Sequence, residues 1–266
     1  MKRITIAELE RMRLAGERIT MLTCYDASFA QLCEEAGVDC LLIGDSLGMV
    51  LQGHDSTLPV RLEDIAYHTE CVARRATRAL IIADMPFGSY QESPAQAMRN
   101  AATLLAAGAH MVKLEGGSEF AETIRFLSAR GVPVCGHLGL TPQSVHQFGG
   151  YRIQGRGASA ANGLLADAGA LQQAGMRMVV LEGMPASLAE RVTHQLSIPT
   201  IGIGASPACS GQVLVLHDML DVTRGRKPRF VRNFMADAAS VEGAIRAYVE
   251  AVRNGSFPGP EHCYPE

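Results

Sequence analysis

Acidic side chains follow several short apolar segments of this chain, at places where an isolated charge would be costly to bury. Asp45 and Ser46 come directly after the apolar run Leu41-Leu42-Ile43-Gly44, and Asp84 lies near the end of a second such run. Further ionisable residues occupy similar places later in the chain: Lys113, Glu115, His137 and Glu182. The sequence therefore raises the question of what balances the charge at these positions.

Carboxylates that share one confined site repel one another, and each raises the pKa of its neighbours. A divalent cation removes that repulsion. A donor set made only of oxygen atoms suits Mg²⁺ best, with Mn²⁺ or Ca²⁺ as poorer fits. The chain lacks the His and Cys spacing of a structural zinc site. If Asp45, Asp84, Glu115 and Glu182 meet in the fold, these residue types predict a magnesium site.

Eight almost wholly apolar segments alternate with helical patterns, which is typical of a parallel sheet covered by helices. These segments are Ile19 to Asp26, Val38 to Asp45, Ala79 to Pro86, His110 to Gly116, Val132 to Gly139, Met176 to Gly183, Pro199 to Ala205 and Gln212 to Asp218. Helical patterns cover residues 28–37, 61–77, 93–108, 118–131, 158–175 and 186–197. Eight such units predict an α/β protein, a closed (β/α)₈ TIM barrel that forms a single domain over residues 1–266.

Glycine, serine and proline mark the ends of the predicted helices. Four helical patterns end in a glycine suited to a C-cap: Gly37, Gly108, Gly131 and Gly175. Ser93 with Pro94, and Ser118, are suited to helix starts. Residues 1–17 form an amphipathic pattern that predicts an extra N-terminal helix. Only the stretch 206–211 separates the last two strands, so the seventh helix is expected to be missing or reduced to a turn.

Catalytic groups of such barrels lie at the carboxyl ends of the strands, where the ionisable residues of this chain fall. Lys113 and Glu115 are two residues apart in a strand, so they share one face and point into the barrel mouth, while Val112 and Leu114 face the helices. A single acidic residue at a strand end is commonly a cap or a loop partner, and Lys113 with Glu115 is also suited to an interior ion pair. The recurrence on five consecutive strands favours a functional site.

Composition excludes several classes of function. The net charge is −3 and the pI is about 6.2, which does not indicate a nucleic-acid surface, and no basic run indicates binding to an anionic membrane. The short basic stretch 224–229 is expected to be a solvated loop. No apolar run approaches the roughly 18 residues of a membrane span, and no signal peptide is seen. Seven scattered cysteines predict reduced thiols in a cytosol-like compartment.

A series of motifs resembles one known family nearly from end to end. In order they are GDSLGMV, STLPV, DMPFGSY, KLEGG, GHLGLTPQ, GGYRIQGR, GIGA and GQVLVLHDML, within residues 19–234. The chain resembles the ketopantoate hydroxymethyltransferase family. That resemblance implies a (β/α)₈ barrel that transfers a one-carbon unit from 5,10-methylenetetrahydrofolate to 3-methyl-2-oxobutanoate, giving 2-dehydropantoate and tetrahydrofolate on the route to pantothenate and coenzyme A. It also implies Mg²⁺ as cofactor and a cytoplasmic homodecamer.

The resemblance assigns roles to the residues noted above. Asp45 and Asp84 are expected to be magnesium ligands, with Glu115 as a further ligand, directly or through water. Ser46 and Lys113 are expected to bind the 2-oxo acid together with Asp45 and Asp84. Glu182 is expected to accept the C3 proton, and His137 to contact the substrate.

The chain departs from the family pattern at Ser206 and Ser210, where the family usually has Gly and Asp. The departure puts in doubt the shape of the last connection, which is expected at the barrel mouth, and a contact near the folate. Two other functions are compatible with the residue pattern. One is a magnesium-dependent 2-oxo acid lyase or phosphonopyruvate mutase-like barrel, although no cysteine lies in a matching lyase motif. The other is an inactive barrel that serves as a scaffold.

Overall fold

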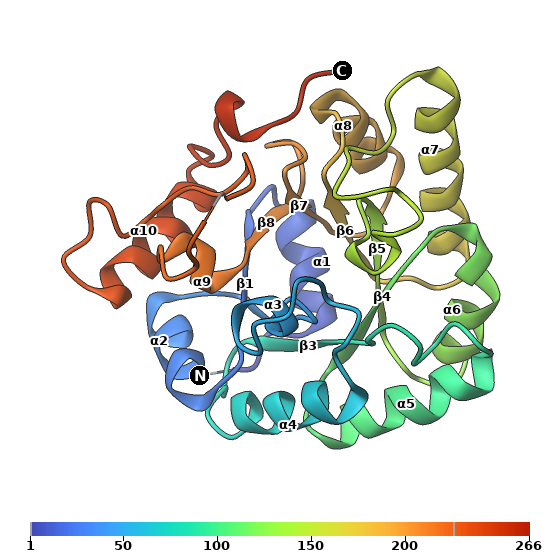
Figure 1. Cartoon of the computed structure of the whole chain (residues 1–266), viewed down its shortest axis with the longest axis horizontal. Coiled ribbons are helices and arrows are strands. Elements are labelled where there is room, and N and C mark those ends of the chain that lie inside the picture. Colours follow the sequence, from blue (N-terminus) through green and yellow to red (C-terminus); the bar gives the residue numbers. More distant parts are fainter. Residues whose placement is uncertain (1, 226) are drawn as a thin grey trace.

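Eight parallel strands close into a barrel in the order in which they occur in the chain (Figure 1). The computed structural model describes residues 2–225 and 227–266. The strands are β1 Ile19–Thr23, β2 Cys40–Ile43, β3 Leu80–Asp84, β4 Met111–Glu115, β5 Val134–Gly139, β6 Met178–Glu182, β7 Thr200–Ile203 and β8 Gly211–Leu214. The predicted (β/α)₈ barrel is confirmed, and each of the first seven predicted strands contains an observed one, whereas β8 begins one residue before its predicted start.

Helices surround the barrel and cover the outer faces of its strands (Figure 1). The longer helices are α1 Ile6–Leu14, α2 Ala27–Ala36, α4 Leu62–Ala73, α5 Pro94–Ala106, α6 Ala121–Ser128, α7 Ala158–Gln173, α8 Ala186–Gln195 and α10 Val241–Arg253. Short helical turns are α3 Leu47–Val50, α9 Leu216–Met219, η1 Ser118–Phe120, η2 Pro142–Ser144 and η3 Pro260–His262. The extra N-terminal helix is confirmed as α1.

Local sequence signals account for several helix ends. Gly37 ends α2 in the left-handed conformation, with φ of 92°, which a residue without a Cβ adopts without strain. Ser93 caps α5 by accepting a hydrogen bond from the backbone N–H of Gln96, and Pro94 occupies the first helical turn. Ser118 begins a 3₁₀ turn, which leads directly into α6. These signals therefore mark the helix boundaries within a few residues.

The barrel register brings the polar strand ends to one level. Asp84 pairs with Lys113 across β3 and β4, and Glu115 pairs with His137 across β4 and β5. Glu182 pairs with Gly139 across β5 and β6. Because parallel strands run in one direction, these four strands deliver the residues to the same end of the barrel.

The barrel closes where β8 pairs with β1, from Ile19 opposite Gly211 to Leu22 opposite Leu214. Tyr248, on α10, is fully buried behind this seam. Its hydroxyl lies 2.9 Å from the carbonyl oxygen of Met21 and 2.8 Å from that of Gln212. The one side chain therefore contacts both strands that close the barrel.

The connection from β7 to β8 contains no helix, as expected. It runs back along the barrel, because parallel strands require the chain to return to the amino end. Ser206, just after β7, is buried, whereas Ser210 bonds to Thr200, the first residue of β7 (3.2 and 3.3 Å). The expectation that both departures from the family pattern lie at the mouth is therefore wrong for Ser210, which lies at the opposite end.

Two further differences from the sequence prediction concern the last quarter of the chain. The eighth strand ends at Leu214, not Asp218, because the chain turns into α9 and the hydroxyl of Thr23 accepts the N–H of Leu216 (2.9 Å). Helix α10 has no counterpart among the predicted helices. The loop expected at 224–229 includes residue 226, which lies outside the described residues; Arg224, Gly225 and Arg229 are exposed.

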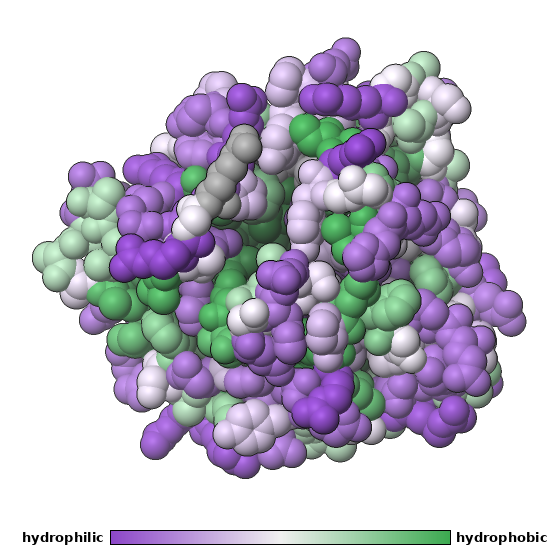
Figure 2. All heavy atoms as spheres, in the orientation of Figure 1, coloured by the Kyte–Doolittle hydropathy of each residue, from purple (hydrophilic) through white to green (hydrophobic). Residues whose placement is uncertain are grey.

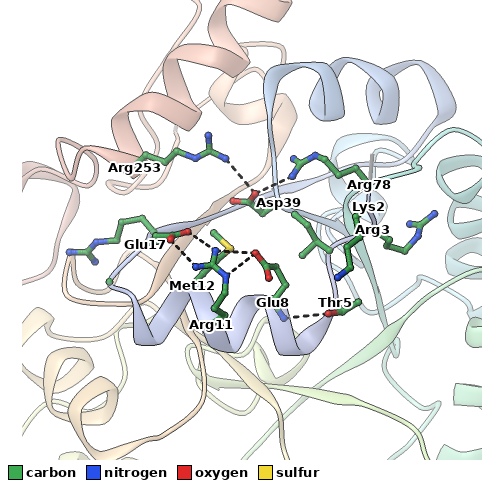
Figure 3. Close-up of a pocket in the computed structure, with 13 residues that line it drawn as sticks. Lys2, Arg3, Thr5, Glu8, Arg11, Met12, Glu17, Asp39, Arg78 and Arg253 are labelled. Carbon is green, nitrogen blue, oxygen red and sulfur yellow. Dashed lines mark hydrogen bonds and ion pairs between the residues drawn. The ribbon is translucent and has the colours of Figure 1, made fainter.

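A hollow of about 780 Å³ lies at the amino end of the barrel, between α1 and the strands (Figure 3). Several of its cationic side chains are paired with other groups of the chain. Arg11 pairs with Glu8 and Glu17 (3.0 and 2.9 Å), and Arg3 donates to the carbonyl oxygens of Ala79 and Ala76 (3.0 and 2.8 Å). This end of a (β/α)₈ barrel serves stability, and the observed contacts agree with that role.

Asp39 is the buried centre of this end of the barrel, and Arg78 and Arg253 point toward it (Figure 3). Its Oδ2 accepts hydrogen bonds from the N–H and hydroxyl of Thr20 (3.0 and 2.8 Å). Its Oδ1 lies 3.5 Å from Arg78 and 3.4 Å from Arg253.

Within the described residues, no helix is long and apolar enough to cross a membrane.

Asp39→Asn should lower the free energy of unfolding by about 1–3 kcal/mol, because the amide nitrogen must face either the Thr20 donors or the guanidinium groups. Urea unfolding followed by circular dichroism measures the change. Asp237→Asn is a matched control at an exposed position and should change stability by less than about 0.5 kcal/mol. Equal effects of the two substitutions would contradict the anchoring role of Asp39.

Candidate active site

Every residue that the sequence predicted for the site lies at the carboxyl end of the barrel. Asp45 and Ser46 follow β2, Asp84 ends β3, and Lys113 with Glu115 belong to β4. His137 lies in β5, and Glu182 is the last residue of β6. All are buried except Ser46 and Glu182, which are partly exposed. The structure thus brings together the complete predicted set.

Lys113 is the cation around which the carboxylates gather. Its Nζ lies 2.6 Å from Asp84 Oδ1 and 3.7 Å from Glu115 Oε1. Burial alone would lower the pKa of this lysine, but the negative charges of Asp84, Glu115 and Asp45 raise it above its ordinary value. Lys113 therefore remains charged, and the prediction that it shares a barrel face with Glu115 is confirmed.

Asp45 and Asp84 are held side by side at the ends of neighbouring strands. The backbone N–H of Asp45 donates to Asp84 Oδ2 (2.9 Å). Burial, followed by repulsion from Asp84 and Glu115, raises the pKa of Asp45 well above its ordinary value. Burial also raises the pKa of Asp84, although Lys113 opposes this effect. Proximity and the loss of water thus make full ionisation of this pair unfavourable.

His137 bridges two carboxylates. Its Nδ1 lies 3.1 Å from Glu115 Oε1, and its Nε2 lies 3.2 Å from Glu182 Oε2. Burial and the charge of Lys113 lower the pKa of His137, but Glu115 and Glu182 outweigh them and raise it to about 9. Burial likewise works to raise the pKa of Glu115, yet the charges of His137 and Lys113 lower it. The imidazolium and the Glu115 carboxylate therefore stabilise each other.

Tyrosine and glutamine side chains complete the site, and sequence reasoning did not identify them. The hydroxyl of Tyr25 lies 2.8 Å from Ser46 Oγ. Gln143 Nε2 donates to Asp45 Oδ2 (2.9 Å), and the hydroxyl of Tyr90 donates to Gln143 Oε1 (2.8 Å). Gln143 and Tyr90 end the motifs GHLGLTPQ and DMPFGSY, so the signal was present, but these residues have no charge to single them out.

The chemistry of the donors fits Mg²⁺ better than other biological metals. Asp45, Asp84 and Glu115 offer only oxygen atoms, and Mg²⁺ binds through one or two carboxylates while keeping several waters. Buried Asp84 Oδ1 faces Lys113 but has no well-directed hydrogen bond, so it has capacity for a further cation. Among the described residues, no three His, Cys, Asp or Glu side chains are grouped closely enough for a site made of protein ligands alone.

A closed parallel barrel that buries a set of coupled ionisable groups at the carboxyl ends of its strands defines an enzyme of the (β/α)₈ class. The family model described as ketopantoate hydroxymethyltransferase matches residues 3–260. The chain belongs to this family.

Individual proteins give the same result. The chain is 65% identical over 264 residues to the 3-methyl-2-oxobutanoate hydroxymethyltransferase of Azoarcus sp. (strain BH72), covering 99% of this chain and 97% of that protein. It is 62% identical to the enzyme of the same name from Burkholderia multivorans (strain ATCC 17616 / 249), covering 98% and 96%. A phosphoenolpyruvate phosphomutase from Streptomyces platensis subsp. rosaceus shares the fold, with a TM-score of 0.61, 14% identity and coverage of 82% and 83%.

The raised pKa of Asp45 has a consequence for stability. An acid whose pKa is higher in the folded protein than the ordinary 3.8 binds its proton more tightly there, so the stability that it contributes is lost as the pH rises through that pKa. Asp45→Asn should therefore make the metal-free protein more stable at pH 7 by about 1 kcal/mol or more. The gain should shrink as the pH is lowered toward 4.

Thermal unfolding in EDTA, measured for both proteins across this pH range, tests the prediction. An Asp45→Asn variant that is less stable than the unchanged protein at pH 7 would show that repulsion does not dominate at this position. Asp55→Asn, on an exposed loop, is the control for the loss of one negative charge.

Proposed function

We propose that this enzyme transfers a hydroxymethyl group from 5,10-methylenetetrahydrofolate to 3-methyl-2-oxobutanoate, producing 2-dehydropantoate and tetrahydrofolate for pantothenate and coenzyme A synthesis. The observation that carries the proposal is the family match along residues 3–260. Convergence of all the expected site residues in one buried mouth supports it and argues against an inactive scaffold.

Asp45 and Asp84 would hold Mg²⁺, with Glu115 as a further ligand, directly or through water. The metal, when bound, supplies a Lewis acid that polarises the 2-oxo acid. The three carboxylates contribute negative charge that only Lys113 and His137 offset among the groups described above. A divalent cation would thus relieve the repulsion that raises the pKa of Asp45.

Ser46 and Lys113 would bind the 2-oxo acid beside the two aspartates. Ser46 is partly exposed at the rim, and its hydroxyl is oriented by Tyr25 (2.8 Å). Lys113 is buried and charged, so it places a fixed positive charge where the oxygen of the substrate becomes negative when the C3 proton leaves. Neither role requires a covalent bond between Lys113 and the substrate.

Glu182 would accept the C3 proton. It is the least buried of the four carboxylates, with 14% of its side chain exposed, so a substrate at the mouth can reach it. His137 Nε2 lies 3.2 Å from Glu182 Oε2 and would hold the carboxylate in position. The structure thus supports an orienting role for His137; the expected contact between His137 and the substrate stays a prediction.

The folate would approach over the outer rim of the mouth. Exposed apolar side chains occur on the loops that follow β2, β3 and β5: Met49, Leu51, Phe87 and Tyr151. Tyr151 bridges two of these loops, since its hydroxyl lies 3.7 Å from Met49 Sδ. Figure 2 shows apolar residues lining a hollow on this face of the molecule. Such a rim suits the flat ring system of a folate, whose reacting carbon must meet the substrate at C3.

The oligomer and the compartment rest on the family resemblance. We propose a cytoplasmic homodecamer, with small molecules and neither nucleic acid nor a membrane as binding partners. The seven cysteines are all free in the structure, which agrees with a reducing compartment.

Glu182→Gln tests the proposed chemistry. The amide cannot accept the C3 proton, so exchange of that proton in 3-methyl-2-oxobutanoate should slow by at least about 100-fold, as expected for the loss of a general base. Proton NMR in D₂O with Mg²⁺ measures the exchange, and isothermal titration should show little change in Mg²⁺ affinity. Exchange at the unchanged rate would refute the assignment of the base.

Folate dependence separates the proposed reaction from that of a 2-oxo acid lyase or mutase. Formation of 2-dehydropantoate should require both 5,10-methylenetetrahydrofolate and Mg²⁺, and EDTA should abolish it. Conversion of a 2-oxo acid without folate would instead support the lyase or mutase.

A further inference from the structure

Gln143 occupies a central position between two carboxylates that come from different strands. It lies in η2 after β5 and is 6% exposed. Its backbone N–H donates to Glu115 Oε2 (2.9 Å), and its side-chain Nε2 donates to Asp45 Oδ2 (2.9 Å). One residue therefore donates to both acids: Asp45, which follows β2, and Glu115, which ends β4.

The orientation of the Gln143 amide is determined by its neighbours. Both hydrogens of Nε2 have acceptors, which are Asp45 Oδ2 and the carbonyl oxygen of Met85 (3.0 Å). Oε1 faces donors, which are the hydroxyl of Tyr90 (2.8 Å) and Nε2 of Gln91 (3.3 Å). A flipped amide would place its oxygen against a carboxylate and a carbonyl, so only the observed orientation satisfies all four contacts.

Tyr90 links the same network to the backbone of β4. Its hydroxyl accepts the N–H of Glu115 (3.1 Å), and its one proton lies near two acceptors, Gln143 Oε1 (2.8 Å) and the carbonyl oxygen of Glu115 (3.0 Å). Tyr90 is 1% exposed, and its ring packs against Phe120 with a centroid distance of 5.1 Å. Because the Tyr90 hydroxyl is buried and faces Gln143 Oε1, it favours the observed orientation of the Gln143 amide.

We propose that Gln143 is a positioning residue that sets the orientation of Asp45 and Glu115 for a divalent cation, and that Tyr90 fixes Gln143 in turn. The inference rests on the proposed function, since it assumes that these carboxylates hold Mg²⁺. One carboxylate oxygen of each acid accepts a hydrogen bond from Gln143, so the other oxygen faces elsewhere in the mouth. Loss of a residue that hydrogen-bonds to a metal ligand typically lowers metal affinity 10- to 100-fold.

Gln143→Met tests the side-chain part of the proposal, because methionine keeps the length and burial of the side chain, and the backbone N–H that faces Glu115, but its side chain donates no hydrogen bond to Asp45. The Mg²⁺ dissociation constant, measured by isothermal titration without substrates, should rise about 10- to 100-fold. Tyr90→Phe, which leaves the ring packing unchanged, should raise it by a few-fold. At saturating Mg²⁺ the kcat of Gln143→Met should largely recover, which a general loss of structure would not allow.

Tyr248→Phe is the matched control. It also removes one fully buried hydroxyl that contacts strand backbone, but at the seam between β1 and β8. It should lower stability while leaving the Mg²⁺ dissociation constant within twofold of the unchanged protein. A similar loss of Mg²⁺ affinity in Tyr248→Phe and Tyr90→Phe would indicate general loosening and overturn the proposal.

Other outcomes are equally decisive. If Gln143→Met binds Mg²⁺ within twofold of the unchanged protein, Gln143 has no positioning role. If Gln143→Met does not fold, Tyr90→Phe decides, and unchanged affinity in that variant overturns the proposal. If the unchanged protein binds no Mg²⁺, both this inference and the proposed metal fail, whereas the hydroxymethyl transfer itself is judged separately by the folate-dependent assay.

Discussion

The buried ammonium group of Lys113 is the interaction on which the site depends. It lies 2.6 Å from Asp84 and 3.7 Å from Glu115, in a mouth that also contains Asp45 and Glu182. Without this cation, the carboxylates would be both desolvated and mutually repelled. The closed barrel makes the arrangement possible, because its register places Lys113 directly opposite Asp84 on the neighbouring strand.

The charge balance of the mouth is graded from one side to the other. Around His137 the positive and negative groups match, and the pKa of Glu115 is lowered. Around Asp45 negative charge dominates, and the pKa of that acid is raised. The site thus has a side where the charges balance, next to the proposed base, and a negatively charged side that favours a cation. In the proposed reaction, the charge-balanced side would serve proton transfer and the negatively charged side would serve metal binding.

Periodicity and motifs predicted the barrel, the missing seventh helix and the charged residues that the structure brings together at the mouth. They were less accurate where contacts between distant parts of the chain determine the local structure. The end of β8 depends on a hydrogen bond from Leu216 to Thr23, and Ser210 lies at the amino end because the connection must return there. The role proposed for Gln143 depends on its contact with Asp45, which lies 98 residues away in the sequence. No local pattern in a single sequence reports such a pair.

The seam between β1 and β8 bears on how the molecule forms. Ile19 and Gly211 pair across most of the chain, so this ladder has a very high contact order. While the protein is being synthesised, one edge of β1 stays unpaired until β8 has been made. An unpaired strand edge can form hydrogen bonds with another chain. Tyr248 is synthesised after β8, and its hydroxyl then bonds to the backbone of both strands. We therefore expect closure of the seam to be a late event in folding, and the period before it to be the one most exposed to aggregation.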